Sequence, residues 1–397
     1  MYNTSPLLYK HIHTDRFINN ISISSGQDDL LLAARKKIRQ TIRAAFAEAR
    51  AYLKGVAGIQ ERDIEWISNI KPKFMTQGSY AYKTINSPCH PTQEIDLDDG
   101  IYLPMSIMRS APEANKDWFF KIIDGALKKL AHQEGWVFTD EKDTCSRLII
   151  PNRQAHIDIP LYAVPDQRHE NMTEALAALK VENRQLSEII YRGDIKSALP
   201  YLLDEDEVYL ATRSNGWQQS DPLLIANWFR RQIDIRGQES GRRLRRICRF
   251  LKSWRDFVWE NGGPSSLTLM ICAAEAYPED DRGRDDYALV EVAKTLPQQL
   301  RGSVKNPATT KEEIVYPRGD MNTEEIATAA SNLVAALESA LSGAVDKGRV
   351  IQSFVGQFGD RIPRKPECIE EVGSAEIVRA TPAVTVKPDP IPNARSR

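Results

Sequence analysis

Apolar residues recur at intervals of three and four along much of the chain, the spacing that lines one face of an α-helix. The first long run lies at 25–55, where Ser25 is a candidate N-cap, and the second follows Pro112. Further runs of this kind begin near Asp221, Gly241, Leu267 and Thr323. The sequence therefore predicts a second half that is largely helical.

A different pattern, in which apolar and polar residues alternate, marks two candidate strands. In residues 94–100, Asp96 and Asp98 project from one face, because successive side chains of a strand point to opposite faces. In residues 155–161, Asp158 lies between two isoleucines and again faces away from them. Strands and helices in separate stretches predict an α+β fold.

A chain of 397 residues exceeds a typical single domain. The pattern divides it into a first lobe at 1–215, which includes the N-terminal helix, a helical lobe at 216–365 and a tail at 366–397. The tail lacks helical or strand periodicity and carries several prolines near its end. We expect it to be extended and flexible.

Composition excludes several classes of protein. The net charge is -1, so no overall field marks a protein that coats nucleic acid or membrane. The five cysteines are scattered without the spacing of a zinc site, which fits a reducing compartment. We find neither a signal-peptide pattern nor an apolar stretch long enough to span a bilayer, and we expect a cytoplasmic protein without a membrane partner.

The three strand acids are the first candidate chemistry. Asp96, Asp98 and Asp158 together would offer oxygen ligands of the kind that Mg²⁺ takes alongside substrate phosphates. Two such ions can activate an attacking hydroxyl and stabilise a departing pyrophosphate. The alternative is a polar strand end exposed to solvent, because paired surface acids are common.

A glycine-serine turn precedes the acids. Gly78 lets backbone N–H groups approach a phosphate, and Ser79 adds a hydroxyl at a candidate helix start. Most such pairs are ordinary turns or caps. Neither a P-loop nor a dinucleotide-binding glycine pattern is present, which argues against those classes. Tyr82 suits stacking on a base or simple packing, and we interpret His156 as a structural histidine.

The most strongly patterned helix of the second half carries a basic face at 242–255. Lys252 lies at the edge of its apolar stripe, where a long cation can be held by packing and still reach a cleft. Another interpretation of the basic face is a nucleic-acid patch.

Six segments together resemble a known family. They are Gln77-Gly-Ser-x-x-Tyr82, Glu94-Ile-Asp-Leu-Asp-Asp-Gly100, His156-Ile-Asp-Ile-Pro160, Ser220-Asp-Pro222, Cys248-Arg-Phe-Leu-Lys-Ser-Trp-Arg-Asp256 and Gly262-Gly-Pro-Ser-Ser266. In this order and spacing they resemble the bacterial cGAS/DncV-like nucleotidyltransferases, or CD-NTases, and above all the bacterial cyclic GMP-AMP synthases.

The resemblance implies a polymerase-β-like nucleotidyltransferase lobe with a mixed sheet, joined to a helical lobe, with nucleotides bound between them. It implies a Mg²⁺ site, or in its place a Mn²⁺ site, at Asp96, Asp98 and Asp158, which would also be the catalytic residues. The nucleotide-binding positions that it implies are Gln77, Gly78, Ser79, Tyr82, Arg147, Ser220, Asp221, Lys252, Ser265 and Ser266.

The implied reaction joins ATP and GTP into 3′,5′-cyclic GMP-AMP and releases pyrophosphate, in bacterial anti-phage signalling. The resemblance also implies a ubiquitin-transfer-like protein that acts on the C-terminal tail. The chain lacks the zinc-binding insertion of animal cGAS, so double-stranded DNA sensing is not expected. Three alternatives stay open: another cyclic di- or oligonucleotide, a linear nucleotidyltransferase, and a nucleotide or nucleic-acid binding module without catalysis.

Overall fold

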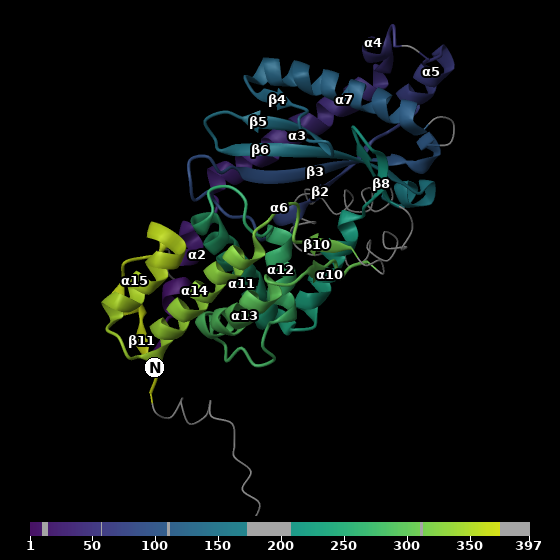
Figure 1. The fold of residues 1–397 in the computed structure, drawn as a ribbon. Coiled ribbons are helices and arrows are strands. Elements are labelled where there is room, and N and C mark those ends of the chain that lie inside the picture. The colour runs from purple at the N-terminus through teal and green to yellow at the C-terminus, as the bar shows by residue number, and fades with distance from the viewer. Residues whose placement is uncertain (10–14, 57, 109–111, 173–207, 310–312, 374–397) are drawn as a thin grey trace, which may run out of the picture.

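The computed structural model describes residues 1–9, 15–56, 58–108, 112–172, 208–309 and 313–373. A lobe built on one mixed sheet lies beside a lobe built of helices, and the short helix α6 (Gly78–Tyr82) stands at their junction (Figure 1). The predicted fold class is confirmed. The division at residue 215 stays a prediction.

The sheet has the order β2-β3-β6-β5-β4, and β7 extends it by pairing with β6 and with β8. Only β3 and β6 run parallel among these described pairs; their neighbours are antiparallel. The strand bounds are β2 (Lys73–Gln77), β3 (Ile95–Pro104), β4 (Val137–Thr139), β5 (Cys145–Ile150), β6 (Ala155–Val164), β7 (Tyr209–Thr212) and β8 (Gly216–Gln219).

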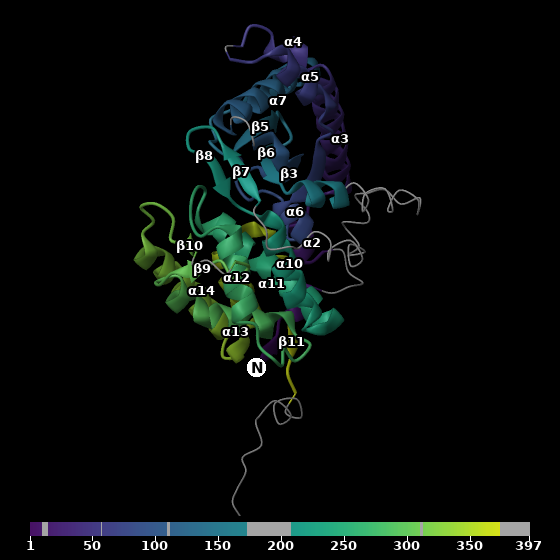
Figure 2. The same ribbon diagram turned by 90° about the vertical axis from the view of Figure 1, so that its right-hand side faces the viewer.

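Two long helices, α3 (Ser25–Ala47) and α7 (Pro112–Glu134), pack together against one face of this sheet, as Figure 2 shows from the side. Ser24, rather than the predicted Ser25, caps α3: its hydroxyl accepts from the Gln27 N–H while the Gln27 side chain accepts from the Ser24 N–H. The smaller elements of the lobe are α4 (Ala49–Leu53), α5 (Glu61–Asn69) and η1 (Met105–Met108).

The apolar side chains of β3 and β6 point into this core, which leaves the opposite face of the two strands for polar residues. Asp99 belongs to the covered face, where Arg39 of α3 donates to both of its carboxylate oxygens at 2.7 and 2.5 Å. Asp96 and Asp98 therefore lie on the face that is not covered by α3 and α7.

The helical lobe is arranged around α11 (Gly237–Val258), whose Trp254 is fully buried. Its other helices are α10 (Pro222–Asp234), α12 (Ser266–Glu275), α13 (Asp285–Gln299), α14 (Thr323–Ser342) and α15 (Lys347–Phe358), with η4 (Gly359–Arg361) and η5 (Pro366–Cys368). The short strands β9 (Val304–Lys305) and β10 (Ile314–Tyr316) pair beside them.

The start of the chain also belongs to the helical core. Elements α1 (Ser5–Leu8) and α2 (Phe17–Asn20) contribute buried side chains to it, although we expected residues 1–215 in the other lobe. Asp286 fastens this segment by accepting from the Thr4 N–H at 2.6 Å.

Part of the predicted flexible tail is ordered. Residues Glu370–Glu371 form β11, which pairs with β1 (Tyr2–Asn3), and the preceding Cys368 and Ile369 are buried. The prediction is wrong for 366–371, because pairing with a distant strand needs no local periodicity. The predicted tail at 374–397 lies outside the described residues.

Candidate active site

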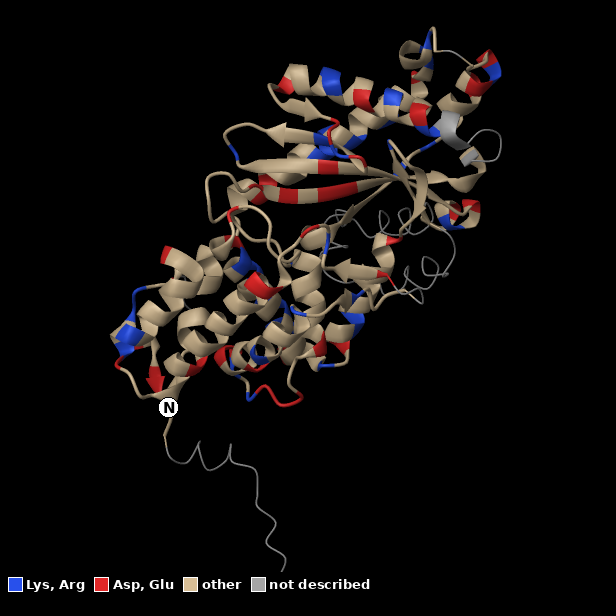
Figure 3. Ribbon diagram, in the orientation of Figure 1, with Lys and Arg blue, Asp and Glu red and all other residues tan. Residues whose placement is uncertain are grey.

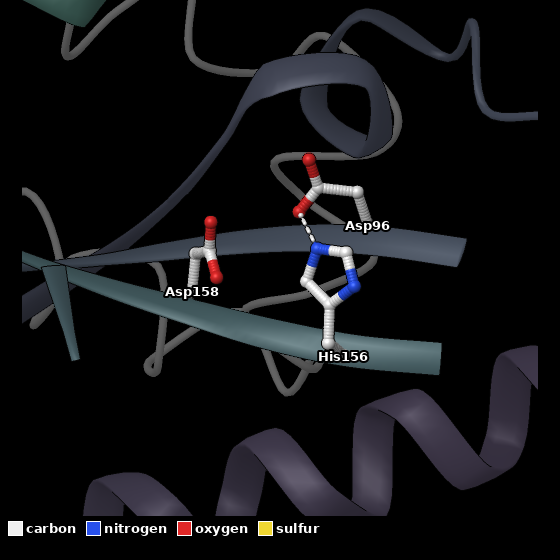
Figure 4. A group of neighbouring side chains, drawn as sticks. All are labelled: Asp96, His156 and Asp158. Carbon is white, nitrogen blue, oxygen red and sulfur yellow. Dashed lines mark ion pairs between the residues drawn. The ribbon is translucent and has the colours of Figure 1, made fainter. Parts of the chain in front are cut away.

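Three acids and one histidine form a compact group on the open face of β3 and β6. The parallel register places Asp96 opposite His156 and Asp98 opposite Asp158. Ligand atoms of Asp96, His156 and Asp158 lie within 4.8 Å of one another, and Figure 4 shows their side chains converging above the two strands. In Figure 3 the same strands carry adjacent acidic segments.

Gly78 lies against this group at the start of α6. Its φ is +61°, and a Cβ there would lie 2.0 Å from Oδ2 of Asp98. Only glycine combines that backbone conformation with so close an approach. The turn and the acids are thus one packed unit.

Burial first, and then the negative charges of Asp96 and Asp158, raise the pKa of Asp98 to about 7. A carboxyl group in this position would ionise readily only beside a cation. The oxygen donors, and Oδ1 of Asp96, which is buried without a hydrogen bond, fit a divalent metal ion.

Asp158 has cationic partners of its own. Arg147 donates to it from Nε at 2.6 Å and from Nη2 at 2.9 Å, and Lys142 donates from Nζ at 2.7 Å. Burial alone would raise the pKa of Asp158, but these hydrogen bonds outweigh it and the pKa is lowered. Asp158 is therefore held as a carboxylate.

A cavity of about 840 Å³ opens between the two lobes in front of the acids. Its volume suits a nucleotide-sized ligand. The predicted site residues that line it are Gln77, Gly78, Ser79, Tyr82, Asp96, Asp98, Ser220, Asp221, Lys252, Ser265 and Ser266. Arg147 and Asp158 do not line the cavity but lie directly beside it through the acid group.

Comparison with known proteins assigns the chain to a family. The nucleotidyltransferase domain of DncV-like cyclic GMP-AMP synthases matches residues 72–162, and the cyclic GMP-AMP synthase C-terminal domain matches residues 241–371. A cyclic GMP-AMP synthase of Escherichia coli strain TW11681 is 31% identical over 350 residues, with 78% of this chain and 79% of the relative covered. The chain belongs to the DncV-like nucleotidyltransferase family. Another cyclic GMP-AMP synthase, from Vibrio cholerae, is 31% identical over 395 residues and covers 88% of each chain.

Solved structures agree with this assignment. Vibrio cholerae DncV in complex with the linear intermediate 5′ pppA(3′,5′)pG has a TM-score of 0.77 at 27% identity and covers 94% of this chain and 99% of its own. DncV in complex with GTP and 5MTHFGLU2 has a TM-score of 0.78 at 27% identity and covers 94% and 100%. The family and enzyme class predicted from the six segments are confirmed.

On the far wall of the cleft of this DncV-like chain, Lys252 is a cation placed to meet an anion. Lys252 is half-buried on α11 and makes no hydrogen bond or ion pair within the described part of the chain. Burial lowers its pKa, although Asp256 acts in the opposite direction. A triphosphate would supply an anionic partner for this ammonium group.

Several predicted nucleotide contacts already have partners inside the protein. The Gln77 side-chain amide donates to the Tyr102 hydroxyl at 2.5 Å. Ser265 caps α12 by accepting from the Thr268 N–H at 3.0 Å, and Asp221 caps α10 by accepting from the Leu223 N–H at 3.0 Å. These side chains shape the walls of the cleft, and their roles toward a nucleotide stay predictions.

Tyr82 and Ser266 also have neighbours. The Tyr82 ring packs edge-on against Phe229 with centroids 6.1 Å apart, and burial followed by the charge of Asp98 raises its pKa. Ser266 accepts from Arg255 Nη2 at 3.2 Å. Both residues line the cavity, so each presents part of its surface to a ligand.

Sequence reasoning missed the opposite rim of the cleft. Its polar residues are Asn306, Thr309, Glu313 and Arg318, which lie on and around the short strands β9 and β10. Strands of two and three residues leave no periodic pattern. Glu94 and Lys142 were missed as well, but Glu94 extends the alternation of Asp96 and Asp98 and could have been found from it.

The contacts of the basic face of α11 argue against a nucleic-acid patch. Arg243 donates to Asp281 at 2.5 Å, Arg246 donates to Asp285 at 2.5 Å, and both pairs are largely buried. Arg249 donates to Asn86 at 2.9 Å. Most of these cations join elements of the protein together.

Proposed function

We propose that this enzyme joins ATP and GTP into 3′,5′-cyclic GMP-AMP and releases two pyrophosphates. The observation that carries the proposal is the cleft itself, with the acids of β3 and β6 on one side and Lys252 on the other. Membership of the DncV-like family supports it, as do the names of the relatives.

In the proposed reaction, the 3′-hydroxyl of one nucleotide attacks the α-phosphate of the other. The new bond joins that oxygen to phosphorus, the bond between the α- and β-phosphates breaks, and pyrophosphate leaves with the electron pair. A carboxylate of the acid group takes the proton of the hydroxyl. A second transfer of the same kind closes the ring.

Asp96, Asp98 and Asp158 would hold Mg²⁺, or Mn²⁺ in its place. When bound, such ions polarise the phosphate and neutralise the charge of the departing pyrophosphate. Lys252 would bind the triphosphate, and Gly78 would keep the α6 backbone close to Asp98. Arg147 and Lys142 hold Asp158 ionised and in position.

A binding module without catalysis is the less favoured alternative. Such a protein would gain nothing from three buried or half-buried acids beside a polyanion, since the charges repel unless a cation lies between them. The loss of most α11 cations to internal ion pairs weakens this alternative further.

The test is product analysis. The purified protein is incubated with the four nucleoside triphosphates and Mg²⁺, and phosphatase-resistant products are identified by mass spectrometry. We expect cyclic GMP-AMP from the wild type and none from Asp98→Ala. A different cyclic product would correct the base selectivity, and phosphatase-sensitive ladders would select the linear alternative. Equal products from both proteins would refute the catalytic assignment.

The biological setting is part of the proposal. We place the enzyme in the cytoplasm, in anti-phage signalling, with a ubiquitin-transfer-like protein acting on its C-terminal tail. The five cysteines are unpaired, which supports a reducing compartment. Within the described residues, no helix has the length and apolar character needed to cross a membrane.

A further inference from the structure

His156 takes part in the acid group itself. It lies opposite Asp96 in the parallel register and two residues before Asp158, so its ring projects from the same face as all three acids. Its side chain is 9% exposed. The polar face of β3 and β6 therefore presents the carboxylates of Asp96 and Asp158 and the imidazole of His156 to the same space (Figure 4).

A second carboxylate orients this ring from behind. Nδ1 of His156 lies 2.7 Å from Oε2 of Glu94. A carboxylate only accepts hydrogen bonds, so Nδ1 carries the proton of this contact. In the neutral ring the lone pair then lies on Nε2, which is the nitrogen that faces Asp96. Histidines that bind metals are commonly oriented by a carboxylate in this way.

On the inner side, Nε2 of His156 faces Asp96, and the two residues form an ion pair when the ring is protonated. Nε2 of His156 lies 2.9 Å from Oδ1 of Asp96, yet both atoms are buried and neither makes a well-aligned hydrogen bond within the described residues. Two lone-pair donors that face one another beside a third, Asp158, are a suitable set of ligands for a cation.

We propose that His156 is a metal ligand through Nε2, next to Asp96 and Asp158, and that Glu94 is the residue that positions it. The proposal rests on the proposed function and adds a nitrogen to an oxygen-based metal site. Mg²⁺ prefers oxygen ligands, whereas imidazole favours transition metals. The site should therefore bind Mn²⁺ more tightly than Mg²⁺, and the difference should depend on His156.

The direct test is pulsed electron paramagnetic resonance of Mn²⁺ bound to the full-length protein without nucleotide. The wild type should show the modulation of a directly coordinated ¹⁴N nucleus. His156→Gln should lose it and should bind Mn²⁺ about tenfold or more weakly, while its affinity for Mg²⁺ falls by a smaller factor. His132→Gln, the same change at an exposed position on α7, should behave as the wild type.

Glu94→Gln separates orientation from ligation. The amide oxygen can still accept from Nδ1 but without charge, so the nitrogen modulation should persist and the Mn²⁺ affinity should fall less than in His156→Gln. Bound Mn²⁺ without nitrogen coupling in the wild type, or no bound Mn²⁺ at millimolar concentration, would overturn the proposal. A protein that makes cyclic GMP-AMP but shows no such coupling would refute only the ligand assignment and leave the proposed function standing.

Discussion

Replacing Gly78 by alanine would place a methyl carbon 2.0 Å from Oδ2 of Asp98. Side-chain carbons do not approach heavy atoms closer than 3.0 Å, so the carboxylate must move by about 1 Å. A displacement of that size at a reacting group lowers turnover about 10²-fold. Alanine in the left-handed conformation, at φ +61°, costs a further ~1–2 kcal/mol of folding free energy.

The two costs can be measured apart. Gly135 has a φ of +69°, and nothing lies within 4 Å of where its Cβ would be. Gly135→Ala should therefore lose only the stability that the left-handed conformation costs, as measured by thermal unfolding, and should keep the wild-type rate of pyrophosphate release. Gly78→Ala should lose both. If Gly78→Ala turned over at the rate of Gly135→Ala, the close packing of Gly78 on Asp98 would have no part in catalysis.

Three further changes test the charges of the site. Burial first, and then the neighbouring acids, raise the folded-state pKa of Asp98 to about 7, so the melting temperature of the metal-free protein should decline as pH rises from about 4. Asp98→Asn should remove that decline while abolishing turnover, and a melting temperature below that of the wild type at pH 8 would contradict this. Lys252→Ala should raise the nucleotide KM more than it lowers kcat, and an unchanged KM would exclude it from triphosphate binding. Burial raises the pKa of Asp158, but the hydrogen bonds to this carboxylate outweigh burial and lower the pKa, so these bonds stabilise the fold at pH values above the unfolded-state pKa. The stability lost in Lys142→Met should therefore be largest at neutral pH and fade as pH falls, and a pH-independent loss would refute the charge effect.

Much of the site could be predicted from local patterns. Alternation along β3 places Asp96 and Asp98 together, and the same alternation places Asp158 on one face of β6. These features depend on neighbouring residues in the chain, which is why they can be read from it. Lys252 could be placed at the edge of the α11 stripe for the same reason.

The meeting of β3 and β6 could not be derived in this way. Parallel strands are joined by a long crossover, here through α7, β4 and β5. The residues of either strand alone do not determine the register between the two strands. That register brings His156 to Asp96, a contact that the local pattern of neither strand predicts. Arg147 was expected near nucleotides, whereas its contacts in the described structure are with Asp158.

The sequence did not predict other features, because their elements are short or because their partners are distant in the chain. The hairpin of β7 and β8 closes near Asn215 and Gly216, a strong turn signal, but its strands have four residues each. The N-terminal segment reaches the helical core through Asp286, which lies more than 280 residues away. Such contacts depend on the tertiary fold.

The central claim is that the acids of β3 and β6 carry out two nucleotidyl transfers on one ATP and one GTP. The most direct measurement follows ATP, GTP, pyrophosphate and the phosphatase-resistant product together over time. We predict equal consumption of the two nucleotides and two pyrophosphates for each cyclic molecule, with no turnover in Asp158→Asn. One pyrophosphate per product, consumption of a single nucleotide, or full turnover in Asp158→Asn would contradict the account.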